Sequence, residues 1–221
     1  TITGGNTASR PATPTEGMLY YDTDTHQLLI YNGSKWKADG NDAVLVAAND
    51  SSAADKAAAD YIADGTADES EINTALTAAS SSGSRKTGKV FLFAGTYNVV
   101  ASVSIPNNVT LAGSGASTVL QQPNSNNGTY QMVTNTDTTT GTGITIRDLT
   151  IDGNKANQAS GQMLGIILDH MGGGTGTTAR VGAHITNVTI KNMKGTGGAG
   201  NGVGMRIATS SNNTISGNKF E

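Results

Sequence analysis

The segment NVTLAG at residues 108–113 recurs three times along the chain, as DLTIDG at 148–153, NVTIKN at 187–192 and NNTISG at 212–217. Every copy has Asn or Asp first, Thr third, Leu or Ile fourth and Gly or Asn last, and its second position is usually Val or Leu. Successive copies begin 40, 39 and 25 residues apart. A short alternating unit that returns about every 20–50 residues is typical of solenoid proteins.

Within each copy, the residues before and after the Thr point to the same face of an extended strand. In the first three copies these residues are apolar, and we expect them to face the interior of the solenoid: Val109 and Leu111, Leu149 and Ile151, Val188 and Ile190. The Thr between them should face solvent, and the Gly or Asn that ends each copy suits a sharp turn with left-handed backbone angles. Because every unit is a strand, the sequence predicts an all-β fold of the β-helix type.

Further segments fit the same coils and predict strands at 90–93, 103–105, 117–120, 130–133, 165–168 and 203–207. The stretches 134–143 and 172–178 are rich in Thr and Gly and are predicted loops. A spacing of 39–40 residues is compatible with two coils per copy or with one coil that carries a long loop. The pattern leaves that choice open.

The composition excludes several classes of protein. Gly accounts for 29 of the 221 residues, aromatic residues for 5% and charged residues for 14%, whereas helical bundles and coiled coils need Leu, Glu and Lys in bulk. A net charge of −3 offers no basic face to nucleic acid. The absence of Cys rules out disulfides and Cys-based metal sites. No apolar run is long enough to span a membrane.

Residues 1–40 predict a small β-meander that would serve as an attachment module. Strands are expected at 17–22, 27–31 and 34–37, and Asn32-Gly33 is a strong signal for a two-residue hairpin turn. A three-stranded meander of this size buries little surface by itself. We therefore expect it to pack on a partner chain or on the next domain.

Residues 41–88 are rich in Ala and acidic residues and predict a helical cap before the coils, which occupy 89–221. One helix is expected at 52–63, and a second should begin at Asp68, with Glu71 completing a capping box. The apolar stripe of the second helix is Ile72, Leu76 and Ala79. Such a helix can cover the open end of a solenoid. The acidic run at 39–71 is predicted to be a solvated helix face.

Four segments together resemble a known superfamily: DGTADESEINTAL at 64–76, GKVFLFAGTY at 88–97, IPNNVTLAGSG at 105–115 and LTIDGN at 149–154. Over about residues 60–221 the chain resembles the N-terminal part of the pectate-lyase-like superfamily of right-handed parallel β-helices. The resemblance implies the fold, and it implies that the chain continues beyond residue 221. It does not imply one activity, because the superfamily includes lyases, hydrolases, epimerases and phage tailspikes.

A second resemblance covers PTEGMLYYDT at 14–23 and YNGSKW at 31–36, which are similar to a short module of phage tail fibres. Together the two resemblances imply a tailspike or tail fibre on a phage virion. Such a protein is usually a homotrimer, contacts other virion or tail components through its N-terminal module, and displays a polysaccharide site on its β-helix. No nucleic acid partner and no membrane insertion are expected.

Candidate catalytic residues in the coils are Asp148, Asp152, Asp169 and His170. Glycoside hydrolysis needs two carboxylates about 5–9.5 Å apart, but four residues along a strand span about 13 Å. A pair from adjacent coils would fit better than Asp148 with Asp152. Asp148 also occupies the Asn position of the repeat, where turn chemistry explains it. Asp169-His170 resembles the acid/base pairs of epimerases, although the Asp-Pro-His run of that family is absent. His170 fits a loop residue better than a catalytic one.

Candidate ligand-binding residues are Arg147, Lys155 and Arg206. No carboxylate cluster accompanies them, so no metal site is predicted, and Ca²⁺ would enter only if the protein were a lyase. The aromatic cluster of Tyr20, Tyr21, Tyr31 and Trp36 suits a small core or a trimer interface better than a sugar platform.

The leading hypothesis from the sequence is a structural, receptor-recognising tailspike or fibre protein that binds a cell-surface polysaccharide outside the cell. The alternative is a polysaccharide-degrading enzyme, a lyase or glycoside hydrolase, whose catalytic residues lie mostly beyond residue 221. A third possibility is a monomeric secreted carbohydrate-active enzyme.

Overall fold

The computed structural model describes residues 2–24, 26–31, 33, 35–38, 43–83, 85, 87–172, 181–195 and 202–221. The chain forms two compact units, Thr1–Asp42 and Ala43–Glu221, which we call unit 1 and unit 2. The predicted turn residue Asn32 and most of the predicted loop at 172–178 lie outside the described residues. Within the described ranges, no helix is both long enough and apolar enough to cross a membrane.

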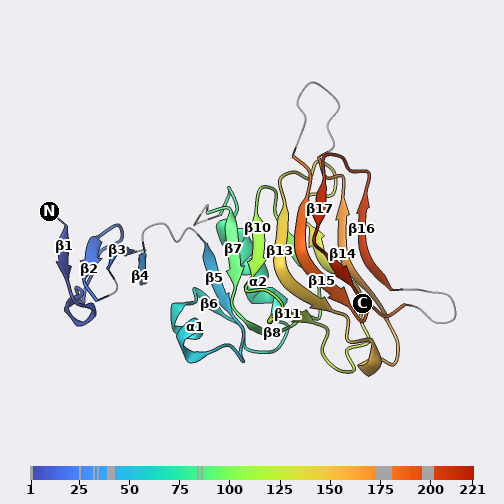
Figure 1. Cartoon of the computed structure of the whole chain (residues 1–221), viewed down its shortest axis with the longest axis horizontal. Helices are drawn as coiled ribbons and strands as arrows, with labels where there is room; N and C mark the ends of the chain where they lie inside the picture. The colour runs from blue at the N-terminus through green and yellow to red at the C-terminus, as the bar shows by residue number, and fades with distance from the viewer. Residues whose placement is uncertain are drawn as a thin grey trace, which may run out of the picture. The chain divides into compact units, whose positions relative to one another are not determined.

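Unit 1 is one small four-stranded sheet in the order β1-β2-β3-β4 (Figure 1). The three expected strands are present and antiparallel, as β2 (Leu19–Asp22), β3 (Gln27–Tyr31) and β4 (Trp36–Ala38). The sequence did not predict β1 (Thr3–Gly5), which pairs with β2 in parallel. A 3₁₀ turn, η1 (Thr7–Ser9), follows β1.

One face of the small sheet carries the core of unit 1. Tyr20 and Leu29 are buried there, and the Trp36 ring lies 5.7 Å from the Tyr20 ring and 5.5 Å from the Tyr31 ring. Beside them Arg10 Nη2 lies 2.6 Å from the buried carboxylate of Asp22. Tyr20 is therefore a core residue, and the partly exposed rings of Tyr31 and Trp36 pack beside it on the same face.

Unit 2 is built from two sheets in which the described strand pairs are all parallel (Figure 1). The long sheet contains β5 (Val44–Ala47), β6 (Tyr61–Ile62), β7 (Lys89–Leu92), β8 (Gly95–Asn98), β10 (Thr110–Gly113), β11 (Thr118–Gln121), β13 (Thr145–Asp152), β15 (His184–Lys191), β17 (Thr214–Ser216) and β18 (Lys219–Phe220). The second sheet contains β9 (Val103–Ile105), β12 (Thr129–Asn135), β14 (Gln162–Asp169) and β16 (Val203–Ala208). The chain alternates between the two sheets, so unit 2 has the strand order of a parallel β-helix.

The strand register resolves the ambiguity in the repeat. Asp148 and Asn187 are 39 residues apart and hydrogen-bond to each other from the neighbouring strands β13 and β15. One copy of the repeat is therefore one coil with a long loop, and not two coils.

The same register corrects the alignment of the first and last copies. Leu111 pairs with Ile146 and not with Ile151, and Ile215 pairs with Ile185 and not with Ile190. The reason is that β13 and β15 are eight residues long. Each contains two similar alternating halves, so a short motif matches either half. The middle pair of copies was aligned correctly, since Leu149 faces Val188.

The first position of the repeat has a left-handed backbone conformation in all four copies. The sequence predicted this conformation for the last position, where only Asn192 and Gly217 adopt it among the four copies. The φ angles are 59° at Asn108, 57° at Asp148, 55° at Asn187 and 56° at Asn212. Asn and Asp tolerate this left-handed region because their short polar side chains bond locally. Asp148 is therefore explained by turn chemistry, whatever else it does.

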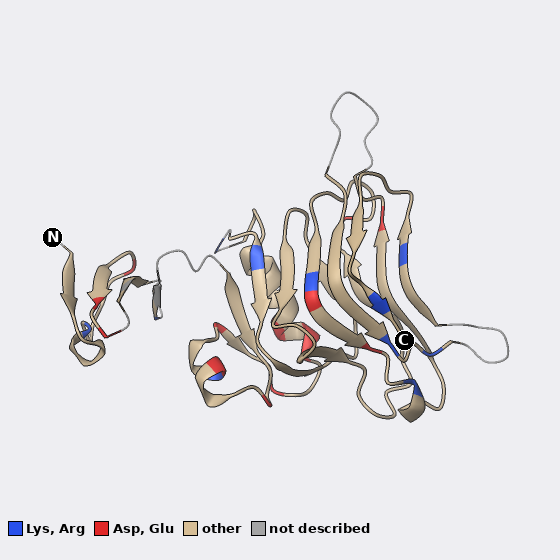
Figure 2. Cartoon of the chain, in the orientation of Figure 1, with Lys and Arg blue, Asp and Glu red and all other residues tan. Residues whose placement is uncertain are grey.

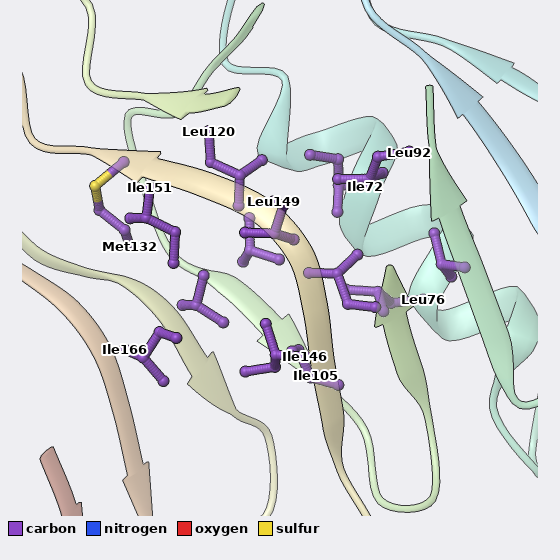
Figure 3. Packing of buried hydrophobic residues seen from close by; sticks show 14 of the residues in the cluster. Ile72, Leu76, Leu92, Ile105, Leu120, Met132, Ile146, Leu149, Ile151 and Ile166 are labelled. Atoms are coloured by element: carbon purple, nitrogen blue, oxygen red, sulfur yellow. The ribbon is translucent and has the colours of Figure 1, made fainter. Parts of the chain in front are cut away.

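Apolar columns run from coil to coil inside unit 2 (Figure 3). All six residues predicted to face the interior are at most 1% exposed. One column is Val44, Val90, Leu111, Ile146, Ile185 and Ile215, and another is Tyr97, Leu120, Ile151, Ile190 and Phe220. The prediction that the middle Thr faces solvent is wrong for Thr150, which is buried. The loop after β10 lies over this residue, and the Thr150 hydroxyl donates a hydrogen bond to the Ala116 carbonyl of that loop, 3.3 Å away.

Two helices precede the coils. α1 (Ala53–Ala58) is shorter than the predicted helix at 52–63, because the chain leaves it to form β6, where Tyr61 pairs with Val46. α2 (Glu69–Ala79) packs against β5, β7 and β9. Its predicted stripe is fully buried in the core: Ile72, Leu76 and Ala79.

The predicted capping box of α2 is absent. The Asp68 carboxylate instead accepts two backbone N–H groups outside the helix, from Gly65 and from Asn98, each at 2.7 Å. Asp68 is fully buried, and α2 begins directly after it.

Three acidic side chains cover the free edge of β8. The amides of alternate residues there point away from β11 and donate to carboxylates: Thr96 to Asp50 (2.8 Å), Asn98 to Asp68 (2.7 Å) and Val100 to Glu69 (3.0 Å). We call Asp50, Asp68 and Glu69 the edge carboxylates. The acidic run is therefore not simply a solvated helix face, because these members replace a neighbouring strand as hydrogen-bond acceptors.

The loop after β12 is organised by Asp137. Its carboxylate accepts the backbone and hydroxyl groups of Thr139 and Thr140 at 2.6–3.0 Å. These hydrogen bonds, led by the Thr140 hydroxyl, hold the pKa of the Asp137 carboxyl below its usual value. The contribution of this turn to stability is thus present above about pH 3.9 and is lost as the pH falls through the lowered pKa.

An NMR titration of the carboxyl carbons checks this prediction. The Asp137 carboxyl should remain ionised below about pH 3.9, and Thr140→Val, which removes the hydroxyl donor, should raise its pKa. A titration of Asp137 at the ordinary aspartate value would contradict the turn geometry.

Candidate functional site

The outer face of the long sheet presents rows of side chains that cross the coils. Val90 and Leu92 are buried, so Phe91 between them faces outward. The register continues from this residue across the sheet in one row: Phe91, Ala112, Arg147, Thr186 and Ser216. This row combines one aromatic ring, one cation and two hydroxyl groups.

Arg147 sits at the centre of a small polar cluster on this face. It forms an ion pair with the adjacent Asp148, and Asn187 on the next coil donates from Nδ2 to Asp148 Oδ1 at 3.2 Å. The adjoining blue and red bands on β13 in Figure 2 mark this pair. The side chains of Arg147 and Asp148 are 40% and 28% exposed. We call Arg147, Asp148 and Asn187 the Arg147 cluster; it leaves guanidinium N–H groups open to solvent.

Asp152, the second candidate on β13, has a structural environment. Its carboxylate accepts the Asn154 amide at 2.8 Å and Asn192 Nδ2 at 3.0 Å, and Lys191 Nζ lies 3.4 Å away. The register places Gln121 and Lys191 beside it on the neighbouring coils. The neighbours of Asp148 and Asp152 in the described coils are therefore not carboxylates, and no pair suited to glycoside hydrolysis forms at β13.

Asp169 and His170 lie at the end of β14, on the second sheet. His170 Nδ1 is 3.1 Å from Asp169 Oδ1, and both side chains are more than a third exposed. The His170 amide donates to Asp169 Oδ1 and to the Ala208 carbonyl, and its φ angle is 52°. This pair closes a turn and does not converge with Asp148.

The remaining predicted cations are scattered. Arg206 is exposed on β16 of the second sheet, in register with Ile167. Lys155 is exposed on the 3₁₀ turn η2 (Lys155–Asn157), after β13. Arg147 alone of the three lies on the outer face of the long sheet. In the part of the chain that the structure describes, no three His, Asp or Glu side chains gather to hold a metal ion.

An aromatic pair near the Arg147 cluster was not among the candidate site residues predicted from the sequence. The rings of Phe91 and Phe93 meet edge to face, with centroids 5.5 Å apart and an angle of 87°. Both side chains are partly exposed, and only Ala112 separates Phe91 from Arg147 in the row. The signal was present in the alternation of VFLF at 90–93, which places both Phe residues opposite the buried Val90 and Leu92.

No family model matches this sequence, and no curated protein sequence matches it. Among solved structures, the chain is similar to the A-module of mannuronan C-5 epimerase AlgE4 from Azotobacter vinelandii, with a TM-score of 0.54 and 24% identity over 71% of this chain. The chain shares the β-helix fold of this module. The AlgE6 A-module from the same organism gives a TM-score of 0.53 and 22% identity over 69% of this chain.

The chain spans about half the length of the β-helix modules it matches, since the alignments cover 47% of the AlgE4 chain and 45% of the AlgE6 chain. ORF18 of Geobacillus virus E2 aligns over 99% of this chain and 53% of its own, with 14% identity and a TM-score of 0.36. That score is too low to indicate a common fold.

Proposed function

We propose that this chain is a structural, receptor-recognising protein of the tailspike or tail-fibre kind, which binds a cell-surface polysaccharide on the outer face of the long sheet. The observation that carries the proposal is that the partly exposed Phe91–Phe93 pair lies two strands from the Arg147 cluster on the same face of the long sheet. An aromatic ring covers the apolar face of a sugar, and a guanidinium with neighbouring amide and hydroxyl groups bonds its polar edge.

The repetition of the coils supports a polymeric ligand. Adjacent strands lie about 4.8 Å apart, so equivalent positions recur along the solenoid axis and can meet successive units of a chain. The A-modules of similar fold carry the name of an epimerase that acts on mannuronan, which is itself a polysaccharide. Loops and sheet faces on a rigid solenoid also make a preorganised surface, which lowers the entropic cost of binding an extended ligand.

We extend the proposal to the handedness of the coils, the roles of the two N-terminal segments, the location of the protein and its oligomeric state. We take the coils to be right-handed, since parallel crossover connections nearly always are. Residues 41–88 act as the cap of the first coil, and residues 1–40 as the module that attaches to other virion or tail components. The protein works outside the cell, on a virion, as a homotrimer.

Binding measurements with Arg147 variants test the proposal. Arg147→Ala should weaken binding of the recognised polysaccharide about ten- to a hundredfold, because a hydrogen bond from a charged donor contributes about 1.5–3 kcal/mol. The affinity of Arg147→Lys should lie between those of the wild type and Arg147→Ala, since lysine keeps the charge but lacks the planar guanidinium. A panel of bacterial surface polysaccharides is screened first, and the affinity for the best one is then measured by calorimetry.

The matched control is Arg206→Ala, which removes an exposed arginine from the second sheet. Its affinity should equal that of the wild type. Equal losses of affinity in both variants would mean that the effect comes from net charge alone. An unchanged affinity of Arg147→Ala would mean that the glycan binds elsewhere.

The second candidate is a polysaccharide-degrading enzyme, a lyase or glycoside hydrolase, with catalytic residues mostly beyond residue 221. The exposed Asp169–His170 pair favours it, because a carboxylate 3.1 Å from an imidazole is a usable acid/base group. Release of reducing ends or of unsaturated sugars from the bound polysaccharide, and its loss in Asp169→Asn, would select this function over simple recognition.

A further inference from the structure

Asp148 is the one carboxylate at the first position of the repeat. The other three copies have an amide there: Asn108, Asn187 and Asn212. All four residues share the same left-handed backbone, with φ between 55° and 59°, so the turn explains an Asn or Asp but not the choice of a carboxylate. Asp148 follows Arg147, whereas an uncharged residue precedes each of the other three copies. The carboxylate therefore occurs only in the copy where a cation comes before it.

The backbone at Asp148 brings two successive side chains to the same face of the sheet. Ile146 and Leu149 are both buried, although strict alternation along a strand would put residues three apart on opposite faces. The left-handed φ of 57° at Asp148 takes up the extra residue. As a result, the Asp148 carboxylate lies on the outer face and pairs with the guanidinium of Arg147 (Figure 2).

The Arg147 cluster offers hydrogen-bond donors and an acceptor side by side. The guanidinium of Arg147 and the amide of Asn187 donate, and the carboxylate of Asp148 only accepts. Asp148 Oδ2 pairs with Arg147 Nη1, and Asp148 Oδ1 accepts Asn187 Nδ2 at 3.2 Å. A carboxylate has about four lone-pair sites, so Asp148 keeps capacity for a further donor.

This combination suits neighbouring hydroxyl groups of a sugar. A hydroxyl group both donates and accepts, so two adjacent hydroxyl groups can bond the Asp148 carboxylate and the Arg147 guanidinium together. A carboxylate on a sugar has no proton to donate, and it would meet Asp148 as a like charge, which suppresses binding of the wrong partner.

We infer that Asp148 positions Arg147 and restricts this site to an uncharged, hydroxyl-bearing sugar of the polysaccharide. The inference rests on the proposed function, since it names the class of sugar bound at the Arg147 cluster. The ion pair cancels the charge of the guanidinium and holds it in place, so Arg147 acts as a directional hydrogen-bond donor and not as an anion site.

Pairs of polysaccharides that differ only in charge test the inference. Acidic bacterial surface polysaccharides that contain uronic acids are compared with their carboxyl-reduced forms, in which a hydroxymethyl group replaces each carboxylate. The wild type should bind the reduced form at least about tenfold more tightly, because the like charge at Asp148 is no longer opposed. Its affinity for the reduced form should change less than about twofold when the salt concentration is raised about tenfold.

Asp148→Asn is the decisive variant, because Asn holds the same turn in the other three copies and should keep the melting temperature unchanged. It should weaken binding of the reduced form about tenfold, since a hydrogen bond to a charged acceptor is lost. Arg147 then lacks its carboxylate partner, so the preference for the reduced form should disappear and binding of the acidic form should weaken with salt. A role confined to the turn would change neither the preference nor the salt dependence.

The matched control is Asp152→Asn, which removes another carboxylate with a cationic partner, Lys191, from the same strand. It changes the net charge by the same amount. Lys89 lies on the same face of the sheet, since the next residue, Val90, is buried, and it is present in both variants. Asp152→Asn should therefore keep the preference and the salt dependence of the wild type.

Three results would overturn the inference alone, with Arg147→Ala still weakening binding. They are a wild type that binds the acidic form at least as tightly as the reduced form, an Asp148→Asn variant that keeps the affinity and preference of the wild type, and equal changes in Asp148→Asn and Asp152→Asn. A wild type that binds none of the polysaccharides would overturn the proposed function, and this inference with it.

Discussion

Ile151→Asp should lower the free energy of unfolding of unit 2 by about 4 kcal/mol or more. Ile151 has no exposed surface and lies in a column between Leu120 and Ile190 of the neighbouring coils. A carboxylate at this position would be surrounded by apolar side chains, so it would have to be protonated or break the column open. Urea unfolding followed by circular dichroism measures the loss.

The control for this substitution is Thr189→Asp, which adds the same group one residue before Ile190 in the next strand. Thr189 lies on the outer side of the long sheet and is partly exposed. Its effect should stay within about 0.5 kcal/mol, as for most surface substitutions. The milder Ile151→Val should cost about 0.5–1.5 kcal/mol. An unchanged melting temperature for Ile151→Asp would contradict the assignment of inner and outer faces.

Alternation and turn residues were enough to predict the buried face and most strands of unit 2. They did not predict β5 and β6, which lie in the segment expected to be a helical cap, or the short β8 and β18. These signals are local: a period of two and an Asn or Asp at the bend can be read from six residues. The register between neighbouring strands was harder to predict, because Ile146 and Ile151 occupy equivalent positions in the two halves of β13. Pairing is decided by contacts across a whole coil, and a six-residue motif cannot tell the halves apart.

The candidate site was predicted only in part for a related reason. Arg147 and Asp148 were singled out by residue type, and their neighbour Asn187 by its place in the repeat. Phe91 was treated only as a strand residue, since its nearness to Arg147 depends on the pairing of three strands. The edge carboxylates were missed in the same way, because each accepts an amide 30 or more residues away in sequence.

Asp68→Ala should destabilise the first coil by about 2–3 kcal/mol, because it leaves two backbone N–H groups without an acceptor. Those groups belong to Gly65 and to Asn98, on the free edge of β8. Burial raises the pKa of the Asp68 carboxyl, so part of the loss is offset when the buried charge is removed. Asp68→Asn keeps one acceptor oxygen and should cost less than Asp68→Ala.

The comparison variant is Asp55→Ala, in the same acidic run. Asp55 accepts the Ser52 hydroxyl at 2.7 Å at the start of α1 and does not touch β8. Its effect should remain near about 0.5 kcal/mol. Similar losses for both variants would mean that the acidic run acts through its total charge, and the edge carboxylates would have no special part in stability.

Hydrogen exchange separates loss of the edge from general weakening. In Asp68→Ala the amide of Asn98 should exchange much faster, because its acceptor is gone. The amide of Val99, which directly follows β8 and donates to the Gln121 carbonyl of β11 at 2.8 Å, should keep its protection. An edge amide without an acceptor is also open to pairing with another chain, so the variant should aggregate more readily on heating. Equal acceleration at Asn98 and Val99 would show that β8 had unfolded as a whole, and that Asp68 holds the strand in place rather than covering its edge.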